Sequence, residues 1–139
     1  MLLEDYRKER LRKLAELRER GIDPYPAKTD RNTKIAEVVD HFEEKQGQEV
    51  VIAGRITAIR SFGKLVFLKV RDYSGEVQVF MRVEESEEAK QAGLLGARDV
   101  KLLDVGDFIE ARGTVDKTKT GEISVFCNFV KILTKTLRP

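Results

Sequence analysis

One aromatic residue, Phe67, stands on the polar face of an alternating segment that spans residues 65–71. Successive side chains of a strand point to opposite faces, so Phe67 shares its face with Lys69 and not with the apolar side chains of Val66 and Leu68. An outward ring beside cations is typical of proteins that bind unpaired nucleic acid, because the ring stacks on a base while the cations hold phosphates. The alternative is that Phe67 covers a neighbouring helix or a crossing strand.

Two polar residues have the chemistry to read the edge of a base stacked on Phe67. Gln78 carries an amide that both donates and accepts hydrogen bonds, which matches the edge of uracil or cytosine. Glu122 only accepts, so it selects a base that turns an N–H toward it. Uracil N3–H meets this requirement and cytosine N3 does not. The residues therefore predict a site for an unpaired pyrimidine, with uracil preferred.

Basic residues near the same segments are candidates for contacts to the nucleic-acid backbone. We expect them to hold phosphates or, for an arginine, to add a donor to the base edge. These residues are Arg55, Arg60, Lys64, Lys69, Lys117 and Lys119. Each alone is more often a solvent-facing charge, but together on one face with Phe67 they favour a binding surface.

The composition argues against an enzyme. Neither G-x-x-x-x-G-K-[ST] nor G-x-G-x-x-G occurs, no paired carboxylates are placed for acid–base work, and His41 has no ligating or nucleophilic neighbour. Cys127 is the single cysteine, which excludes an intrachain disulfide and favours a reducing, cytoplasmic setting. No apolar run is long enough to span a bilayer. We expect a chain that binds without a cofactor, has no membrane partner, and carries its nucleic-acid site locally, since the net charge is only +2.

The periodicity predicts helices first and strands afterwards. The expected helices cover residues 3–20 and 34–46, with a short third helix over 84–92, and the expected strands cover 50–59, 65–71, 76–83, 108–115 and 123–133. This order predicts a mainly β protein, a five-stranded OB-fold barrel with an N-terminal helical extension (1–48) before the barrel (49–139) and a short helix between strands 3 and 4.

The OB-fold places the candidate residues together. Such barrels bind oligonucleotides on the face of strands 2 and 3, bordered by the loops between strands 1 and 2 and between strands 4 and 5. A two-residue turn at Tyr73 and Ser74 puts Phe67 opposite Phe80 and diagonal to Gln78, close enough for Phe67 and Gln78 to touch one base. Alternation also predicts that Phe80 points outward with Gln78.

The chain resembles class II lysyl-tRNA synthetases along nearly its whole length. The resemblance rests on these segments: 14–18 (LAELR), 21–26 (GIDPYP), 53–56 (AGRI), Gly63-Lys64 with Phe67, Gly75 with Gln78, 117–122 (KTKTGE) and 137–139 (LRP). Aspartyl and asparaginyl enzymes share much of the strand 2 and 3 signature, and 70–72 (VRD) is closer to theirs. The segment 84–100 is longer than is usual for lysyl enzymes. The segments 21–26 and 117–122 favour lysine.

The resemblance implies an N-terminal anticodon-binding domain that stops where the catalytic domain of the family begins. It implies that the middle uridine of the lysine anticodon stacks on Phe67, while Gln78, Glu122 and Arg60 make polar contacts to that base or its neighbours. The partners implied are tRNA, through its lysine anticodon stem-loop, and the catalytic domain of a parent lysine–tRNA ligase, which would hold ATP and Mg²⁺.

Three other functions stay open from the sequence. One is a general OB module for single-stranded nucleic acid, and another is an aspartyl- or asparaginyl-type anticodon domain. The third is a protein-interaction module in which the exposed leucines of helix 3–20 support a homodimer.

Overall fold

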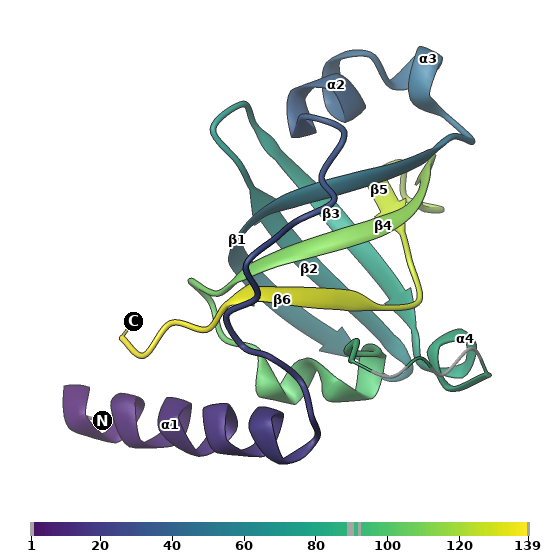
Figure 1. The fold of residues 1–139 in the computed structure, drawn as a ribbon. Coiled ribbons are helices and arrows are strands. Elements are labelled where there is room, and N and C mark those ends of the chain that lie inside the picture. The colour runs from purple at the N-terminus through teal and green to yellow at the C-terminus, as the bar shows by residue number, and fades with distance from the viewer. Residues whose placement is uncertain (1, 89–90, 92, 139) are drawn as a thin grey trace.

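A closed β-barrel forms the centre of the computed structural model, which describes residues 2–88, 91 and 93–138 (Figure 1). The helices are α1 (Leu3–Glu19), α2 (Ile35–Asp40), α3 (Phe42–Lys45) and α4 (Val83–Glu88), with a 3₁₀ helix η1 (Ala97–Leu102). The strands are β1 (Glu49–Phe62), β2 (Leu65–Arg71), β3 (Glu76–Arg82), β4 (Phe108–Lys117), β5 (Ile123–Phe126) and β6 (Val130–Thr134). Helices α2 and α3 lie at one end of the barrel and α1 lies across the other (Figure 1).

The barrel closes through one parallel pairing. Neighbouring strands follow the order β1-β2-β3-β5-β4, and β4 returns to pair with β1. The β3–β5 pair is parallel and the other pairs are antiparallel. This arrangement, with an N-terminal helix and a short helix after β3, confirms the predicted OB-fold.

Two glycines allow strands to cross closely at the corners of the barrel. A Cβ on Gly113 would collide with the carbonyl oxygen of Phe126, and one on Gly54 would lie 2.5 Å from the carbonyl oxygen of Arg71. Glycine is the residue that leaves room for such an approach of one backbone to another.

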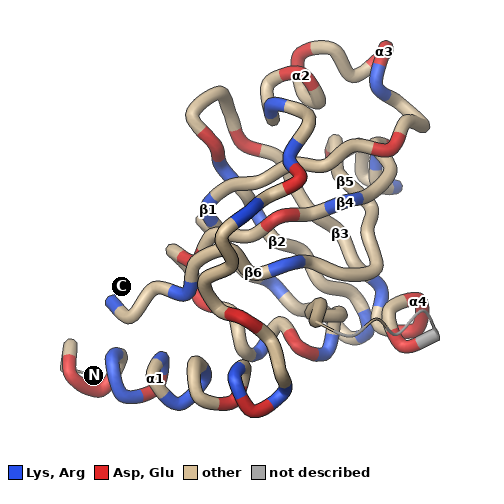
Figure 2. Tube along the Cα trace, viewed as in Figure 1, with Lys and Arg blue, Asp and Glu red and all other residues tan. Residues whose placement is uncertain are grey.

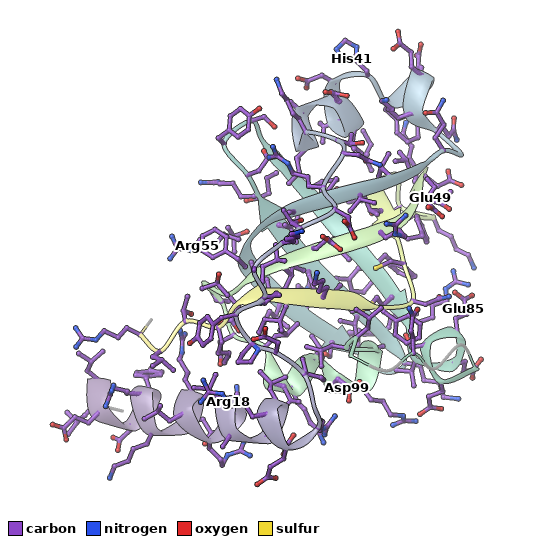
Figure 3. All side chains as sticks on the ribbon, in the orientation of Figure 1. Arg18, His41, Glu49, Arg55, Glu85 and Asp99 are labelled. Atoms are coloured by element: carbon purple, nitrogen blue, oxygen red, sulfur yellow. The ribbon has the colours of Figure 1, made fainter. Side chains whose placement is uncertain are left out.

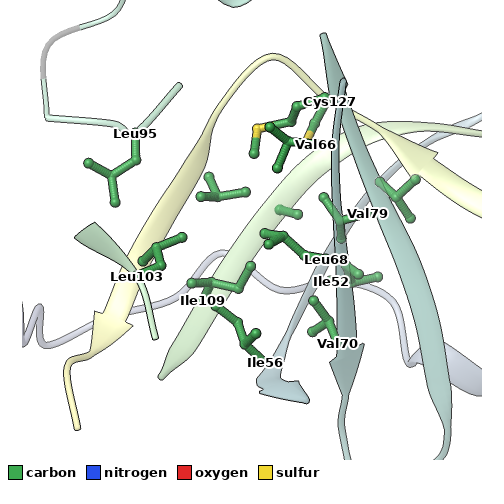
Figure 4. Packing of buried hydrophobic residues seen from close by; sticks show 14 of the residues in the cluster. Ile52, Ile56, Val66, Leu68, Val70, Val79, Leu95, Leu103, Ile109 and Cys127 are labelled. Carbon is green, nitrogen blue, oxygen red and sulfur yellow. The ribbon is translucent and has the colours of Figure 1, made fainter. Parts of the chain in front are cut away.

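The barrel interior is filled by the apolar side chains that alternation assigned to the inner faces (Figure 4). Ile52, Ile56, Leu68, Val79 and Ile109 are completely buried. Full burial of such a side chain stabilises the fold by about 1.5–3 kcal/mol relative to leaving it in water. The inner face therefore fixes which side chains remain on the outer face.

The prediction of one continuous helix over 34–46 is wrong, because the structure has two short helices there. His41 leaves helical geometry, with φ −117° and ψ 39°, so α2 ends at Asp40 and a separate turn, α3, follows. The His41 side chain is exposed at the end of the barrel (Figure 3).

The predicted fifth strand over 123–133 is interrupted at residues 127–129. Its first part, β5, pairs with β3 and β4, and the Cys127 amide donates a last bond to the Phe80 carbonyl. Its second part, β6, pairs with β4, and Val130 also forms an isolated bridge with Leu95, so the chain bends where it leaves β3. Of the predicted helix over 84–92, residues up to 88 are helical, and residues 89, 90 and 92 lie outside the described residues.

The turn between β2 and β3 also anchors helix α2. Asp72 Oδ2 accepts the Ile35 amide at 3.0 Å and Ser74 Oγ accepts the Ala36 amide at 3.0 Å. Burial alone would raise the pKa of Asp72, but hydrogen bonds from Ser74, Ile35 and Gly75 lower it below its ordinary value. A carboxylate and a hydroxyl from a distant hairpin thus each satisfy one free amide of the first helical turn.

Helix α1 is fastened to the barrel by a buried ionic network. Lys135 is completely buried and lies 2.5 Å from Asp104 and 2.7 Å from Asp107. Arg10 of α1 donates to the hydroxyl of Thr136 at 2.9 Å and Lys13 pairs with Asp104 at 2.8 Å. Burial alone would raise the pKa of Asp104, but hydrogen bonds from Lys13 and Lys135 lower it.

None of the helices in the described part of the chain is long and apolar enough to cross a membrane. Basic and acidic residues are interleaved along α1 (Figure 2). Salt bridges join Glu9 and Glu16 to Arg12 within the helix, and Glu16 to Arg20 just after its last residue.

We predict that Lys135→Met lowers the free energy of unfolding by about 3–5 kcal/mol, because it leaves the buried carboxylate of Asp107 without its cation. Urea denaturation followed by circular dichroism measures this. Arg112→Gln is the matched control, since its pair with Glu49 at 3.3 Å is exposed to solvent. Equal midpoints for the two variants would contradict a stabilising role for the network.

Candidate nucleic-acid interface

A groove of about 920 Å³ runs over the outer face of β2 and β3 and is bordered by the loop between β4 and β5. Strands β1 and β5 complete its walls. The lining residues are Ala58, Arg60, Phe62, Leu65, Phe67, Lys69, Gln78, Phe80, Arg82, Lys117, Thr118, Lys119, Thr120, Glu122 and Phe126. The structure therefore brings together Phe67, Gln78, Glu122 and Arg60, the four predicted base-contacting residues.

An aromatic row crosses the floor of this groove. Phe67 pairs with Phe80 across β2 and β3, as the predicted turn required, and Phe80 pairs with Phe126 of β5. The Phe67 and Phe80 rings meet edge to face, with centroids 5.0 Å apart and planes at 74°. Such pairs favour this geometry, so Phe80 holds the Phe67 ring in place.

Phe80 is on the groove side of β3, as alternation predicted, but only 6% of it is exposed. The ring of Phe126 lies against it with centroids 4.9 Å apart, and the Arg82 guanidinium lies 5.3 Å from its centroid. Phe80 is therefore a support beneath the groove, and Phe67 is the ring that a base can reach.

A polar row runs beside the aromatic one. Lys69 pairs with Gln78, and Gln78 pairs with Ser124 of β5. The Gln78 amide nitrogen donates to the Ser124 hydroxyl at 2.9 Å, and that hydroxyl donates to the Glu122 carbonyl at 3.2 Å. Gln78 is thus fixed by one amide hydrogen and keeps its carbonyl oxygen and second amide hydrogen for a base.

Lys69 and Glu122 form an ion pair across the groove, with Nζ 2.9 Å from Oε1. Both side chains remain well exposed, at 39% and 47%. The sequence assigned Lys69 to phosphates and Glu122 to the base edge. Their pairing gives Lys69 a further role, because it orients the Glu122 carboxylate and leaves the second carboxylate oxygen to accept an N–H.

The other predicted cations divide into two groups. Arg60, Lys117 and Lys119 line the groove, although the Lys117 ammonium also lies 4.9 Å from the centroid of the Phe42 ring. Arg55 and Lys64 lie outside it.

Arg55 projects from the barrel beside Gly106 (Figure 3), and Lys64 pairs with Glu84 at 2.8 Å. Contacts of these two residues to RNA stay a prediction, and they would be made beyond the groove.

The groove concentrates positive charge. Five of its lining residues are basic and one is acidic, a net charge of +4, whereas the whole chain carries +2. Concave basic surfaces attract anionic ligands by focusing the electrostatic field. The aromatic floor and the basic walls together suit a single-stranded nucleic acid.

Sequence reasoning missed Phe62 and Arg82 as groove residues. The first strand was expected to end at residue 59, but β1 continues to Phe62 and the turn consists of Gly63 and Lys64 alone. The signal was the alternation of Arg60 and Phe62 combined with a glycine at the first position of a two-residue turn.

The described residues contain no group of three or more His, Cys, Asp or Glu side chains placed to hold a metal ion. Burial raises the pKa of the Cys127 thiol to about 12, which keeps it protonated and unreactive. The groove has an aromatic ring for stacking, polar side chains for hydrogen bonding and basic side chains that neutralise an anionic ligand.

Lys69→Gln and Glu122→Gln should each change the free energy of unfolding by less than about 1 kcal/mol, because exposed ion pairs contribute little to stability. Thermal and urea unfolding of both variants and of the double variant test this. A larger loss would mean that the pair holds the barrel together, and its role in orienting Glu122 would then be secondary.

Comparison with known proteins agrees with this geometry. Residues 50–133 match the family described as OB-fold nucleic acid binding domain, of the tRNA anticodon type. The chain is 42% identical over 132 residues to a lysine–tRNA ligase of Carboxydothermus hydrogenoformans, 39% over 133 residues to that of Pelotomaculum thermopropionicum and 39% over 131 residues to that of Clostridium perfringens.

These alignments include 94–95% of this chain and 24–26% of each relative, so the chain spans about a quarter of the length of the curated relatives it matches. The similarity to lysyl-tRNA synthetases inferred from the motifs is confirmed. By its barrel, its groove and the match over residues 50–133, the chain belongs to the tRNA anticodon family of OB-fold nucleic acid binding domains.

Proposed function

We propose that this chain is the anticodon-binding domain of a lysine–tRNA ligase and that its groove recognises the middle uridine of the lysine anticodon. The observation that carries the proposal is the position of Phe67 between the Gln78 amide and the basic wall of one groove, in a chain that aligns with lysine–tRNA ligases over nearly its whole length.

In the proposed complex the base stacks on Phe67, whose ring is braced from below by Phe80. Stacking of a base on an aromatic side chain contributes about 1–3 kcal/mol to binding. Arg60, directly opposite Phe67 on β1, donates to the base or to its phosphate. Lys117 and Lys119 hold the backbone on the far side of the groove.

Uracil suits the polar row better than cytosine does. The Glu122 carboxylate accepts the N3–H of uracil, and the carbonyl and amide hydrogen of Gln78 complement the same edge. At cytosine, the unprotonated N3 would face a carboxylate, and two acceptors repel. Discrimination by such contacts is strong when a wrong base leaves a polar group of the protein unpaired.

The activity of the longer protein is also part of the proposal. We infer that the parent is a cytoplasmic lysine–tRNA ligase, whose catalytic domain binds ATP and Mg²⁺ and aminoacylates the tRNA. This chain contributes recognition of the anticodon and no catalytic group. The boundary between extension and barrel is proposed at residues 48 and 49, where the first strand begins.

A general single-stranded nucleic-acid module is the second candidate. The aromatic floor and the charge of the groove favour it, because both are tolerant of sequence. A homodimer through α1 also stays a prediction, supported by exposed apolar side chains at Leu3, Tyr6 and Leu11.

The middle base of the anticodon distinguishes the first two candidates. We expect this chain to bind a lysine anticodon stem-loop more tightly than a stem-loop in which cytidine replaces the middle uridine. Fluorescence anisotropy at fixed salt measures both, because affinity for RNA depends on salt. Equal affinities would favour the general module, and the absence of any salt-sensitive binding would favour an interaction module.

Replacement of Phe67 tests the stacking. Phe67→Leu should weaken binding of the stem-loop by about 1–3 kcal/mol, or roughly five- to 150-fold, because leucine keeps the apolar contact with Phe80 but has no flat face. Phe67→Tyr keeps the ring and should bind like the native chain. If Phe67→Leu lowers the melting temperature and leaves the affinity unchanged, the ring belongs to the core.

A further inference from the structure

We propose that Phe62 is a second stacking platform, which takes a nucleobase next to the one held by Phe67. The inference rests on the proposed function and extends it by one nucleotide. It assigns to the end of the groove a ligand of defined chemistry, a planar base attached to an anionic backbone.

Phe62 is the most exposed of the phenylalanines, with 75% of its surface open to water, although it lines the groove. Within the described part of the chain no aromatic ring or cation packs against its ring. An exposed ring of this size, at the mouth of a groove, is uncovered in the free protein and available to a ligand.

The turn beside Phe62 holds its backbone firmly. Phe62 pairs with Leu65, and the two residues between them are Gly63, with φ +60°, and Lys64, with negative φ. This is the pattern of a type II′ hairpin turn, whose twist matches that of the flanking strands. The ring is therefore presented from a regular strand end, which reduces the entropy lost when a base stacks on it.

Register places Phe62 beside Phe67 on the same face. Arg60 pairs with Phe67, and two residues further along β1, Phe62 pairs with Leu65. Rows two residues apart lie about 7 Å from each other along a strand. The two rings thus stand at adjacent positions along the groove, which suits two neighbouring bases.

The charges around Phe62 favour an anionic ligand over an apolar one. Arg60 lies one row away and has no ion-pair partner among the described residues, and Arg82 lies across Leu65 on β3. Two acidic residues near these cations are already paired, since Glu84 lies 2.8 Å from Lys64 and Glu85 lies 3.8 Å from Arg82. A nucleotide would stack its base on the Phe62 ring and place its phosphate beside the Arg60 guanidinium.

Tyr73 provides a matched control. It is 74% exposed and sits in the turn between β2 and β3, outside the groove. The Tyr73 ring also lies 5.8 Å from the Lys34 ammonium, a surface contact that contributes little to stability. Phe62→Ala and Tyr73→Ala remove equally exposed rings, and both variants should fold like the native chain.

The experiment measures binding of lysine anticodon stem-loops that are changed at the base before or after the middle uridine. In one set this base is replaced by an abasic site. In the other set it is replaced by 2-aminopurine, whose fluorescence is quenched by stacking. With intact RNA we expect Phe62→Ala to weaken binding about tenfold, and Phe62→Tyr and Tyr73→Ala to leave it unchanged. With the abasic site at the flanking position that Phe62 contacts, the native chain and Phe62→Ala should bind equally. 2-Aminopurine there should be quenched by the native chain and not by Phe62→Ala.

Three results would overturn the inference. Native affinity of Phe62→Ala would do so, as would a tenfold loss that persists both when the base before the middle uridine is abasic and when the base after it is abasic. Quenching at both flanking reporters that is the same for the native chain and Phe62→Ala would show that the Phe62 ring stacks on neither flanking base. Phe67→Leu and the cytidine stem-loop separate this from the proposed function: if they retain their losses while Phe62→Ala binds normally, only the second platform fails.

Discussion

The register of β2 against β3 is the constraint on which the groove depends. A two-residue turn at Tyr73 and Ser74 sets it, and Asp72 fixes the turn by accepting hydrogen bonds from Ser74 and Gly75. Side chains alternate between the faces of a strand, so a slip of one residue would move Phe67 into the barrel and Leu68 into water. The same carboxylate also caps α2, which ties the end of the barrel to the hairpin that carries the site.

Closure of the barrel supplies the other half of the groove. The parallel pairing of β3 with β5 brings Ser124 beside Gln78 and Phe126 beside Phe80, although these residues lie far apart in the sequence. Without β5, the Gln78 amide would lose the hydroxyl that fixes it and Phe80 would be uncovered. Gly113 of β4 lets β5 approach closely from its other side, because a Cβ there would collide with the carbonyl oxygen of Phe126. Fold closure and ligand geometry therefore depend on the same contacts.

The sequence was sufficient to predict features that neighbouring residues determine, such as the alternation of a strand and the length of a turn. Alternation separated the inner from the outer residues of β2, and the short turn determined that Phe67 faces Phe80. The sequence was insufficient where the burial or pairing of a side chain depends on a residue far away in the chain. The burial of Phe80 depends on Phe126, the pairing of Lys69 depends on Glu122 from another loop, and the exposure of Phe62 depends on how far β1 runs before its turn. Arg55 and Lys64 have the right charge for the groove but lie outside it. Arg55 lies next to the bulge of β1 between Ile56 and Ala58, and Lys64 pairs with Glu84.

The ionic groups of the chain are distributed according to what each must do. Lys135 and Asp107 are completely buried, so neither can exchange its partner without exposing an unpaired charge to a medium that solvates it poorly. That network can only hold α1 and the end of the barrel in place.

Lys69 and Glu122 are paired at a similar distance but in contact with water, where the attraction is small and nearly balanced by solvation. A ligand that offers equivalent hydrogen bonds can therefore replace either partner at little cost. Strong ion pairs lie where the fold needs rigidity, and exchangeable ones lie where the proposed base must enter.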